Sequence, residues 1–576
     1  MEQMNELWGS TESVLSVDDP KATYFKQCKF AMFVHWGLYS HTGGIWKGKT
    51  YHGITEWLMC TANISAADYA DIAKEFNPSD FDAADFVATA KAAGMKYIIV
   101  TAKHHEGFAM FRSKDPFNIY DATPFKRDPM AELAEECRKQ GLGFGFYYSQ
   151  FQDWQAYNRW DESLKDADFE KYFQEKCLPQ IEELLTHYGK LALIWFDTPG
   201  KMTPEQSKKI VELVHRYQPE ALVNSRIGNG VGDYSSMNDN EVPAHRIPGL
   251  WECIRTSNNS WGYSAIDQDF CSASEILWDL IQVVARGGTF MLNVGPDPKG
   301  NIPAPCRHAL LETGKWLQKY GDKVIYSAQS SPWTTVRSWG DCTRRKEKAY
   351  FVLQNWLPGK TITEYGFPGV IREVTWLGKN QKLRFEQNEK SFKIDLPEMT
   401  GDDLYEVLEI VCEKEIGELT DSVITADPLY PCHLKAETAV LTNAEFKHDF
   451  WAERFGEFIY VNIIHNWQPN AKATWDFELT EPGCYRISIR YQKVDLQNRV
   501  WKISVSNGAV IERWLPDAQQ LPPPPMQAEP TARFHTARAG VISFDKPGRY
   551  SLTLESCRPE LPAELHVAEV ILERFK

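Results

Sequence analysis

The sequence has no apolar run long enough for a membrane helix and no excess of basic residues. A membrane helix needs roughly 18 consecutive apolar residues, and no stretch of the 576-residue chain is that long. Lys and Arg number 63 against 78 Asp and Glu, which gives a formal net charge of −15. Because an acidic surface repels phosphate backbones, we expect neither nucleic acid nor membrane as a partner.

Paired cysteine motifs are also missing. None of the twelve cysteines belongs to a Cys-x-x-Cys pair, and a chain of this length does not depend on a disulfide framework. We therefore expect reduced thiols with structural roles. The first residues, 1–6, have neither the basic start nor the apolar core of a secretory signal. This predicts a cytoplasmic protein, or a secreted one if a leader has been removed.

Aromatic residues, in contrast, are abundant. The chain contains 20 Trp, 24 Tyr and 30 Phe, together 13% of its residues. Aromatic faces fill protein cores and also stack on the C–H faces of sugars. The excess is consistent with a carbohydrate ligand without establishing one.

The first 325 residues alternate short apolar runs with longer amphipathic stretches, a pattern typical of a parallel sheet with helical crossovers. About eight such units in ~300 residues predict an α/β fold of the (β/α)8-barrel type. Residues 227–250 give the weakest unit, because Gly and Asn dominate there. The expected strands are residues 30–36, 97–101, 143–148, 191–196, 221–223, 251–256 and 289–294.

Two β-sandwich-like domains are expected after the barrel. Residues 326–420 alternate strand patterns with Pro-Gly turns and contain no long helical pattern. Residues 430–576 form a second β-rich region, which we expect to bind carbohydrate or to mediate oligomerisation. Two of its segments, 482–489 and 547–554, each begin with Pro-Gly and continue as an alternating strand with a tyrosine. This echo suggests similarly placed hairpins in one sandwich.

Several histidines follow predicted strand ends, where barrels carry their functional side chains. They are His35, His104 and His105. An adjacent pair is a poor two-ligand motif, because neighbours on a strand point to opposite faces. Hydrogen bonding to a polar ligand is therefore the favoured role, while a core role and a metal site remain alternatives.

Carboxylates provide the second group of candidates. Asp197 ends the strand-like run 191–197, two residues after Trp195, and either faces the site or caps the helix predicted near Pro204. The loop 232–243 contains Asp239 and Glu241 among other polar residues. A retaining glycosidase needs two carboxyl groups about 5–5.5 Å apart, and this loop is a reasonable source of the second.

A set of motifs over residues 20–325 resembles the α-L-fucosidases of glycoside hydrolase family 29. The motifs are FVHWGLYS (33–40), EW (56–57), KHHEGF (103–108), KRD (126–128), GFYYS (145–149), IWFD (194–197), VNSRIG (223–228), WE (251–252), SWGY (260–263) and GGTFMLNVGP (287–296). The resemblance implies a barrel, a retaining mechanism without metal or cofactor, and hydrolysis of terminal α-L-fucose from oligosaccharides or glycoconjugates. Because members of that family are often oligomers, we also expect a homo-oligomer.

By the same resemblance, Asp197 is the nucleophile. The residues expected to bind fucose are His35, Glu56, Trp57, His104, His105, Tyr148, Trp195 and Arg226. The acid/base lies in the loop that matches least well; Glu241 is the first choice, Asp239 the second and Glu252 the third. A barrel that binds sugar without catalysis is the competing interpretation. The fucosyl linkage is not determined by these motifs.

Overall fold

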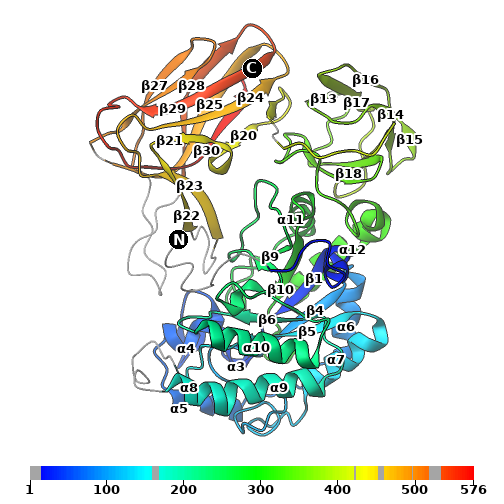
Figure 1. Cartoon of the computed structure of the whole chain (residues 1–576), viewed down its shortest axis with the longest axis vertical. Coiled ribbons are helices and arrows are strands. Elements are labelled where there is room, and N and C mark those ends of the chain that lie inside the picture. Colours follow the sequence, from blue (N-terminus) through cyan, green and yellow to red (C-terminus); the bar gives the residue numbers. More distant parts are fainter. Residues whose placement is uncertain are drawn as a thin grey trace.

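The computed structural model describes residues 14–157, 168–420, 423–451, 459–495, 497–517 and 534–575. A barrel occupies one end of the molecule, and two β domains lie beside each other at the other end (Figure 1). This arrangement confirms the predicted (β/α)8-type barrel followed by β domains.

The barrel wall is an eight-stranded parallel sheet in the order β7-β6-β5-β4-β1-β10-β9-β8. An isolated parallel bridge between Asn224 and Tyr234 joins its two ends and closes the cylinder. The strands are β1 (Phe30–Val34), β4 (Tyr97–Lys103), β5 (Gly143–Ser149), β6 (Leu193–Asp197), β7 (Leu222–Val223), β8 (Ser235–Ser236), β9 (Trp251–Thr256) and β10 (Thr289–Val294).

Helices cover the outside of this wall, but no α-helix separates β7, β8 and β9, where the sequence pattern is weakest. The α-helices are α2 (Ala22–Cys28), α3 (Leu38–Thr42), α4 (Leu58–Thr61), α5 (Ala66–Asp71), α6 (Ala83–Ala92), α7 (Pro129–Gln140), α8 (Phe169–Tyr172), α9 (Leu178–His187), α10 (Pro204–Tyr217), α11 (Ala273–Ala285) and α12 (Ala304–Val324). Shorter elements are β2 (Ile45–Trp46), β3 (Lys49–Thr50), η1 (Thr55–Trp57), η2 (Ile72–Lys74), η3 (Phe173–Cys177) and η4 (Ser225–Ile227).

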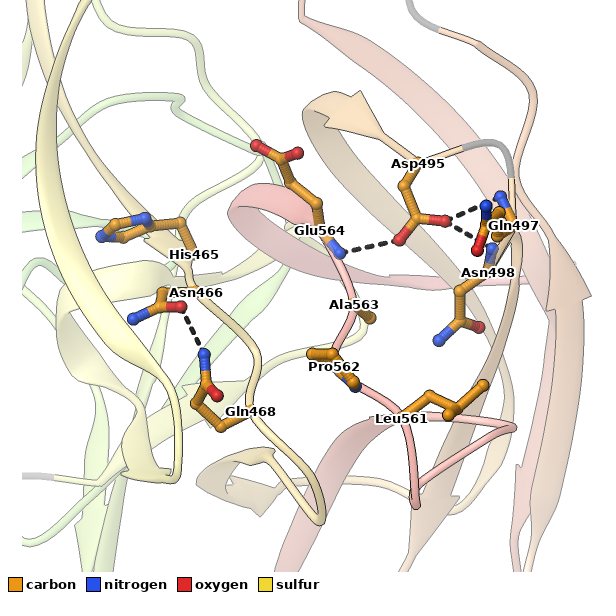
Figure 2. A pocket seen from close by; sticks show the side chains of 10 residues that line it. All are labelled: His465, Asn466, Gln468, Asp495, Gln497, Asn498, Leu561, Pro562, Ala563 and Glu564. Atoms are coloured by element: carbon orange, nitrogen blue, oxygen red, sulfur yellow. Dashed lines mark hydrogen bonds between the residues drawn. The ribbon is translucent and has the colours of Figure 1, made fainter.

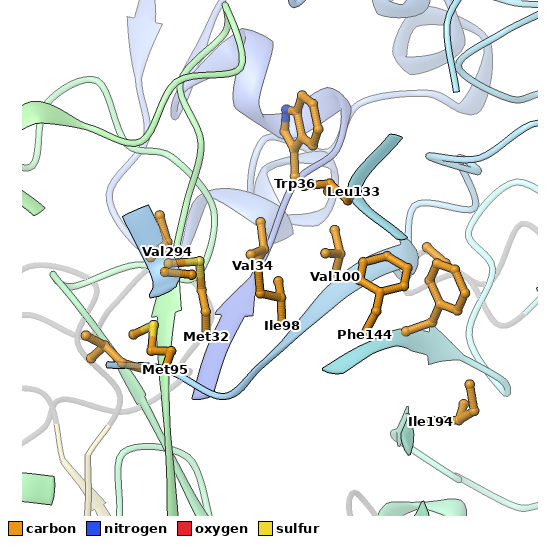
Figure 3. Packing of buried hydrophobic residues seen from close by; sticks show 14 of the residues in the cluster. Met32, Val34, Trp36, Met95, Ile98, Val100, Leu133, Phe144, Ile194 and Val294 are labelled. Atoms are coloured by element: carbon orange, nitrogen blue, oxygen red, sulfur yellow. The ribbon is translucent and has the colours of Figure 1, made fainter. Parts of the chain in front are cut away.

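Side chains along each barrel strand alternate between the barrel interior and the layer under the helices. In β1, Phe33 faces the interior and packs near Tyr147 and Trp195. Its neighbours Met32 and Val34 belong to the large outer core, which Figure 3 shows between the sheet and the surrounding elements. This alternation decides which residues at a strand end can reach a site inside the barrel.

The helix after β6 is capped without the help of Asp197. The Thr203 side chain accepts a hydrogen bond from the Gln206 backbone N–H, and the Gln206 side chain accepts one from the Thr203 backbone N–H. Pro204 occupies the first turn, where its missing N–H costs nothing. The helix-cap alternative for Asp197 is therefore wrong, because Thr203 has that role.

The middle β domain pairs a five-stranded sheet, β11-β12-β18-β14-β15, with a three-stranded sheet, β13-β17-β16. Its core includes Trp333, Trp339, Phe351 and Trp376. The strands are β11 (Gly340–Arg345), β12 (Lys348–Leu353), β13 (Thr361–Tyr365), β14 (Ile371–Trp376), β15 (Gln381–Lys382), β16 (Phe385–Gln387), β17 (Ser391–Asp395) and β18 (Glu406–Cys412).

The C-terminal domain consists of two six-stranded sheets around a separate core. One sheet contains β19 (Ile424–Ala426), β21 (Val440–Thr442), β24 (Lys472–Leu479), β26 (Val500–Val505), β27 (Val510–Trp514) and β29 (Gly548–Ser556). The other contains β20 (Cys432–Lys435), β22 (Glu445–Trp451), β23 (Ile459–His465), β25 (Gly483–Val494), β28 (His535–Phe544) and β30 (Leu565–Arg574). A 3-10 turn, η5 (Ala436–Thr438), follows β20.

Among the described residues, no helix combines the length and the apolar character needed to cross a membrane.

Candidate active site

Asp197 is the last residue of β6, at the carboxyl end of the barrel. Its side chain is 12% exposed. Tyr147 donates a hydrogen bond to Oδ2 over 2.9 Å, and the Gln150 side chain accepts one from the Asp197 backbone N–H, also over 2.9 Å. Burial raises the pKa of Asp197, while the neighbouring Arg226 opposes that rise. Asp197 is therefore held at its side chain by Tyr147 of β5 and at its backbone by Gln150, the residue directly after β5.

Arg226 connects Asp197 to a second carboxylate. Its Nη1 lies 3.1 Å from Oδ1 of Asp197, and its Nη2 lies 2.7 Å from Oδ1 of Asp239. The same Nη2 donates to the Met237 carbonyl over 2.8 Å. The guanidinium also lies 4.9 Å from the ring centre of Trp195, within cation–π range. One buried cation thus holds two acidic side chains together.

Three predicted histidines converge beside Asp197. Nε2 of His105 lies 3.8 Å from Oδ2 of Asp197, and its Nδ1 shares a hydrogen bond with Ser149 over 2.7 Å. His35 pairs its Nδ1 with Oδ1 of Asn293 over 2.7 Å. The ring of His104 stacks on Tyr147 with centres 5.4 Å apart. Burial lowers the pKa of all three imidazoles, so they are neutral hydrogen-bonding groups near pH 7.

Glu56 and Trp57 approach from the η1 turn. Oε2 of Glu56 accepts the Gly262 backbone N–H over 2.9 Å, which ties the EW motif to the SWGY motif. Burial raises the pKa of Glu56 to about 8. Trp57 is half-buried and lies edge-on to His105, with ring centres 5.5 Å apart. An indole with one exposed side is suited to covering a sugar ring.

The three candidates for the second carboxylate occupy different places. Asp239 contacts Arg226, whereas Oε2 of Glu241 accepts hydrogen bonds from the backbone and side-chain amides of Asn238. Glu252 is the second residue of β9 and accepts a hydrogen bond from the indole of Trp195 over 2.8 Å. Asp239 therefore shares the guanidinium of Arg226 with the predicted nucleophile.

The structure does not bring Tyr148 to this group. Its hydroxyl donates to Gln180 of α9 over 2.8 Å, in the layer outside the barrel wall. Tyr147, one residue earlier, points inward and contacts Asp197 instead. Sequence reasoning missed Tyr147 and Gln150. The alternation of β5 signals Tyr147, which shares its face with Ser149, whereas Gln150 lies beyond the strand and has no such signal.

These groups form a cluster with neutral histidines, one guanidinium and at least two acids. Such a set can hydrogen-bond several hydroxyl groups and supply a nucleophile and a proton donor. In the part of the chain that the structure describes, no three His, Cys, Asp or Glu residues are grouped so as to hold a metal ion. The chemistry and the fold together define a barrel glycoside hydrolase.

Comparison with known proteins gives the family. The model of the α-L-fucosidase family matches residues 3–322. Plasma α-L-fucosidase of Homo sapiens is 29% identical over 412 residues, which cover 66% of this chain and 86% of that protein. The chain belongs to the α-L-fucosidase family, and it is a glycoside hydrolase that acts on fucosylated glycans.

Solved structures extend the likeness. The α-L-fucosidase of Vibrio sp. strain EJY3 is 29% identical with a TM-score of 0.77, covering 98% of this chain and 99% of its own. An α-L-fucosidase from Lactobacillus casei, solved in complex with α-L-fucose, is 40% identical with a TM-score of 0.50. It covers 53% of this chain and all of its own. The likeness to the Vibrio enzyme therefore includes the β domains as well as the barrel.

A separate cavity of about 890 Å³ lies in the C-terminal sandwich. Figure 2 shows that loops after β23 and β25 and the segment before β30 line it. Asp495 holds two of these segments together by accepting the backbone N–H of Glu564 over 2.8 Å. Its lining is polar, apart from Leu561, Pro562 and Ala563. The expected role of this domain in carbohydrate binding or oligomerisation stays a prediction.

Proposed function

We propose that this chain is a retaining exo-α-L-fucosidase in which Asp197 is the nucleophile and a residue of the loop after β8 is the acid/base. The observation that supports this proposal best is the shared contact of Asp197 and Asp239 with Arg226. Retaining glycosidases hold their two carboxyl groups about 5–5.5 Å apart, and both of these acids lie within reach of a single guanidinium.

In the first step, ionised Asp197 attacks the anomeric carbon while the acid/base protonates the departing oxygen. The bond to the aglycone breaks, and a glycosyl ester of Asp197 forms. Water, deprotonated by the same acid/base, then releases fucose with its original configuration. The neutral histidines, Glu56 and Trp57 bind the sugar, and their hydrogen bonds strengthen as positive charge grows on the ring.

Asp197→Ala tests the nucleophile. We expect a loss of at least about a thousandfold in kcat on an aryl α-L-fucoside, because no covalent intermediate can form. Azide should restore turnover and give a glycosyl azide of inverted configuration, as measured by NMR of the product. Near-normal activity of this variant without azide would remove the assignment.

For the acid/base, the contacts favour Asp239 over Glu241, the first choice from sequence. An acid must reach the departing oxygen, whereas Oδ1 of Asp239 is held 2.7 Å from Nη2 of Arg226. The proposal therefore requires the arriving sugar to separate Asp239 from Arg226.

The variants Asp239→Ala and Glu241→Ala distinguish the two candidates. The acid/base variant should lose about a hundredfold or more in kcat/KM on a fucosyl disaccharide but much less on a 4-nitrophenyl fucoside, whose leaving group needs no proton. Azide should accelerate that variant and give a product of retained configuration. If Glu241→Ala shows this pattern and Asp239→Ala does not, Glu241 is the acid/base.

A further inference from the structure

Glu106, the acid of the HHEGF motif, has no role in the proposed mechanism, yet it is buried directly behind the site. It is 1% exposed, and its Oε2 has no hydrogen-bond partner. Nδ1 of His104 is likewise buried without a partner. These two atoms face each other over 3.6 Å. Two unsatisfied buried polar atoms so close together indicate a hydrogen bond that a small movement completes.

Gly37 and Tyr39 pack closely against the carboxyl group of Glu106. A Cβ added to Gly37 would lie 2.7 Å from Oε1 of Glu106 and 2.6 Å from the ring of Tyr39. Any side chain at position 37 would therefore displace the carboxyl or the tyrosine. This close approach explains the glycine in the HWG motif and fixes Glu106 against His104.

We propose that Glu106 is a positioning residue that donates a hydrogen bond from its protonated carboxyl to Nδ1 of His104. A neutral imidazole carries one N–H, and the partner of one nitrogen decides which nitrogen has it. With Nδ1 accepting, Nε2 carries the proton and points away from Glu106. His104 then presents a fixed donor to a sugar hydroxyl, so this inference rests on the proposed function.

Burial supports the protonated state of this acid. It raises the pKa of Glu106 to about 8, and the pKa of His104 falls to about 3 because its ring is also buried. The carboxyl is thus neutral below pH 8, and the ring is neutral throughout.

Charged and titratable groups surround Glu106 on several elements. Besides burial, which is the largest cause, Asp153 raises the pKa of Glu106, and Lys103 and Lys176 lower it. The charge of Glu106 in turn raises the pKa of Glu56. The other neighbours are Tyr39, Tyr69 and His104. Lys103 and Lys176 both form ion pairs with Asp153, and Lys176 also pairs with Asp115, so two carboxylates balance the two lysine charges.

The proposal predicts a change of tautomer with pH. Above about pH 8 the carboxyl of Glu106 loses its proton to solvent. The carboxylate then accepts a hydrogen bond from Nδ1–H, and the single ring proton of His104 is on Nδ1 in place of Nε2. We expect the ¹⁵N shifts of the His104 ring in sugar-free, histidine-labelled protein to report Nε2–H below pH 8 and Nδ1–H above it. The signals are assigned by their loss in His104→Asn.

Glu106→Gln removes the titration but keeps a donor, since its amide N–H can reach Nδ1. This variant should hold the Nε2–H tautomer from pH 6 to 9.5. Glu252→Gln is the matched control, because it also changes a buried glutamate whose pKa is raised, to about 7, but which contacts Trp195. It should leave the His104 transition as in the wild type.

Steady-state kinetics of Glu106 variants provide a second test of the proposal. Glu106→Ala should raise KM for an aryl fucoside about tenfold with a smaller change in kcat, whereas Glu106→Gln should restore most of the affinity. A wild-type His104 that keeps one tautomer over this pH range, or a Glu106→Gln protein that still switches, overturns the proposal. Because the ¹⁵N measurement uses no substrate, it stands apart from any failure of the fucosidase mechanism.

Discussion

Two adjacent tyrosines of β5 serve opposite faces of the barrel wall. Tyr147 points inward, donates to Asp197 and stacks on Trp195 with ring centres 5.5 Å apart. Tyr148 points outward and donates to Gln180. Because strand side chains alternate, a shift of one residue exchanges a site residue for a structural one.

We expect Tyr147→Phe to lower kcat/KM roughly tenfold to a hundredfold, because a hydrogen bond to a charged group contributes about 1.5–3 kcal/mol. The lost donor also raises the pKa of Asp197 further above its ordinary value. Since the nucleophile acts as a carboxylate, the acid limb of the pH–rate profile should move to higher pH. Steady-state kinetics from pH 4 to 8 measure both effects.

The matched control is Tyr148→Phe, which removes the same hydroxyl from the outer face. Its kcat/KM should stay within about threefold of the wild type, with an unmoved acid limb. A large loss in Tyr148→Phe and none in Tyr147→Phe would instead support the prediction from sequence that Tyr148 binds the sugar.

Residues at strand ends were predictable, whereas contacts made by loops were not. His35, His104, His105 and Asp197 follow strong apolar runs, and a barrel brings such ends together. The choice between Asp239 and Glu241 depends on how an irregular loop folds over Arg226. No periodic pattern in that loop reports which carboxylate turns inward.

At the scale of elements, the short strand β7 is completed by a side chain. The Asn224 amide accepts the Phe196 backbone N–H over 2.8 Å and donates to the Phe196 carbonyl over 2.9 Å. The side chain thereby extends the pairing between β7 and β6 by one residue, directly before Asp197. The sequence pattern gives little signal for β7 and β8 because each has two residues and no α-helix follows either strand before β9. At this point the Asn224 side chain makes hydrogen bonds that backbone groups make elsewhere in the sheet.

In the C-terminal domain, the repeated Pro-Gly segments begin the strands β25 and β29. The predicted echo holds in one respect, since both strands lie inside a sheet of the same sandwich. It differs in another, because they belong to opposite sheets. Gly483 and Gly548 have φ values of 141° and 140°, a region that favours glycine. Sequence alone predicted the repeated turn, but strand pairing decided which sheet each strand joined.

At the scale of the molecule, two buried arginines join the domains, one by an ion pair and one by a hydrogen bond to a backbone carbonyl. Arg286, which follows α11 of the barrel, donates to both carboxylate oxygens of Asp341 in β11, over 3.1 and 2.8 Å. Arg337 similarly pairs with Glu364 within the middle domain and donates to the Val423 carbonyl over 2.8 Å, at the start of the C-terminal part. The middle domain therefore contacts both of its neighbours. A cytoplasmic location and a homo-oligomeric state stay predictions.

Asp341→Ala should destabilise the junction between barrel and middle domain by about 3–5 kcal/mol, because it leaves the fully buried Arg286 without its partner. Burial raises the pKa of Asp341 and Arg286 opposes that rise, because taking a carboxylate out of water is costly. Replacing both charges should therefore cost far less. We expect Arg286→Met combined with Asp341→Leu to regain most of the loss in urea unfolding, followed by tryptophan fluorescence. A double variant as unstable as Asp341→Ala would mean that the hydrogen bonds of the pair, and not its uncompensated charge, hold the two domains together.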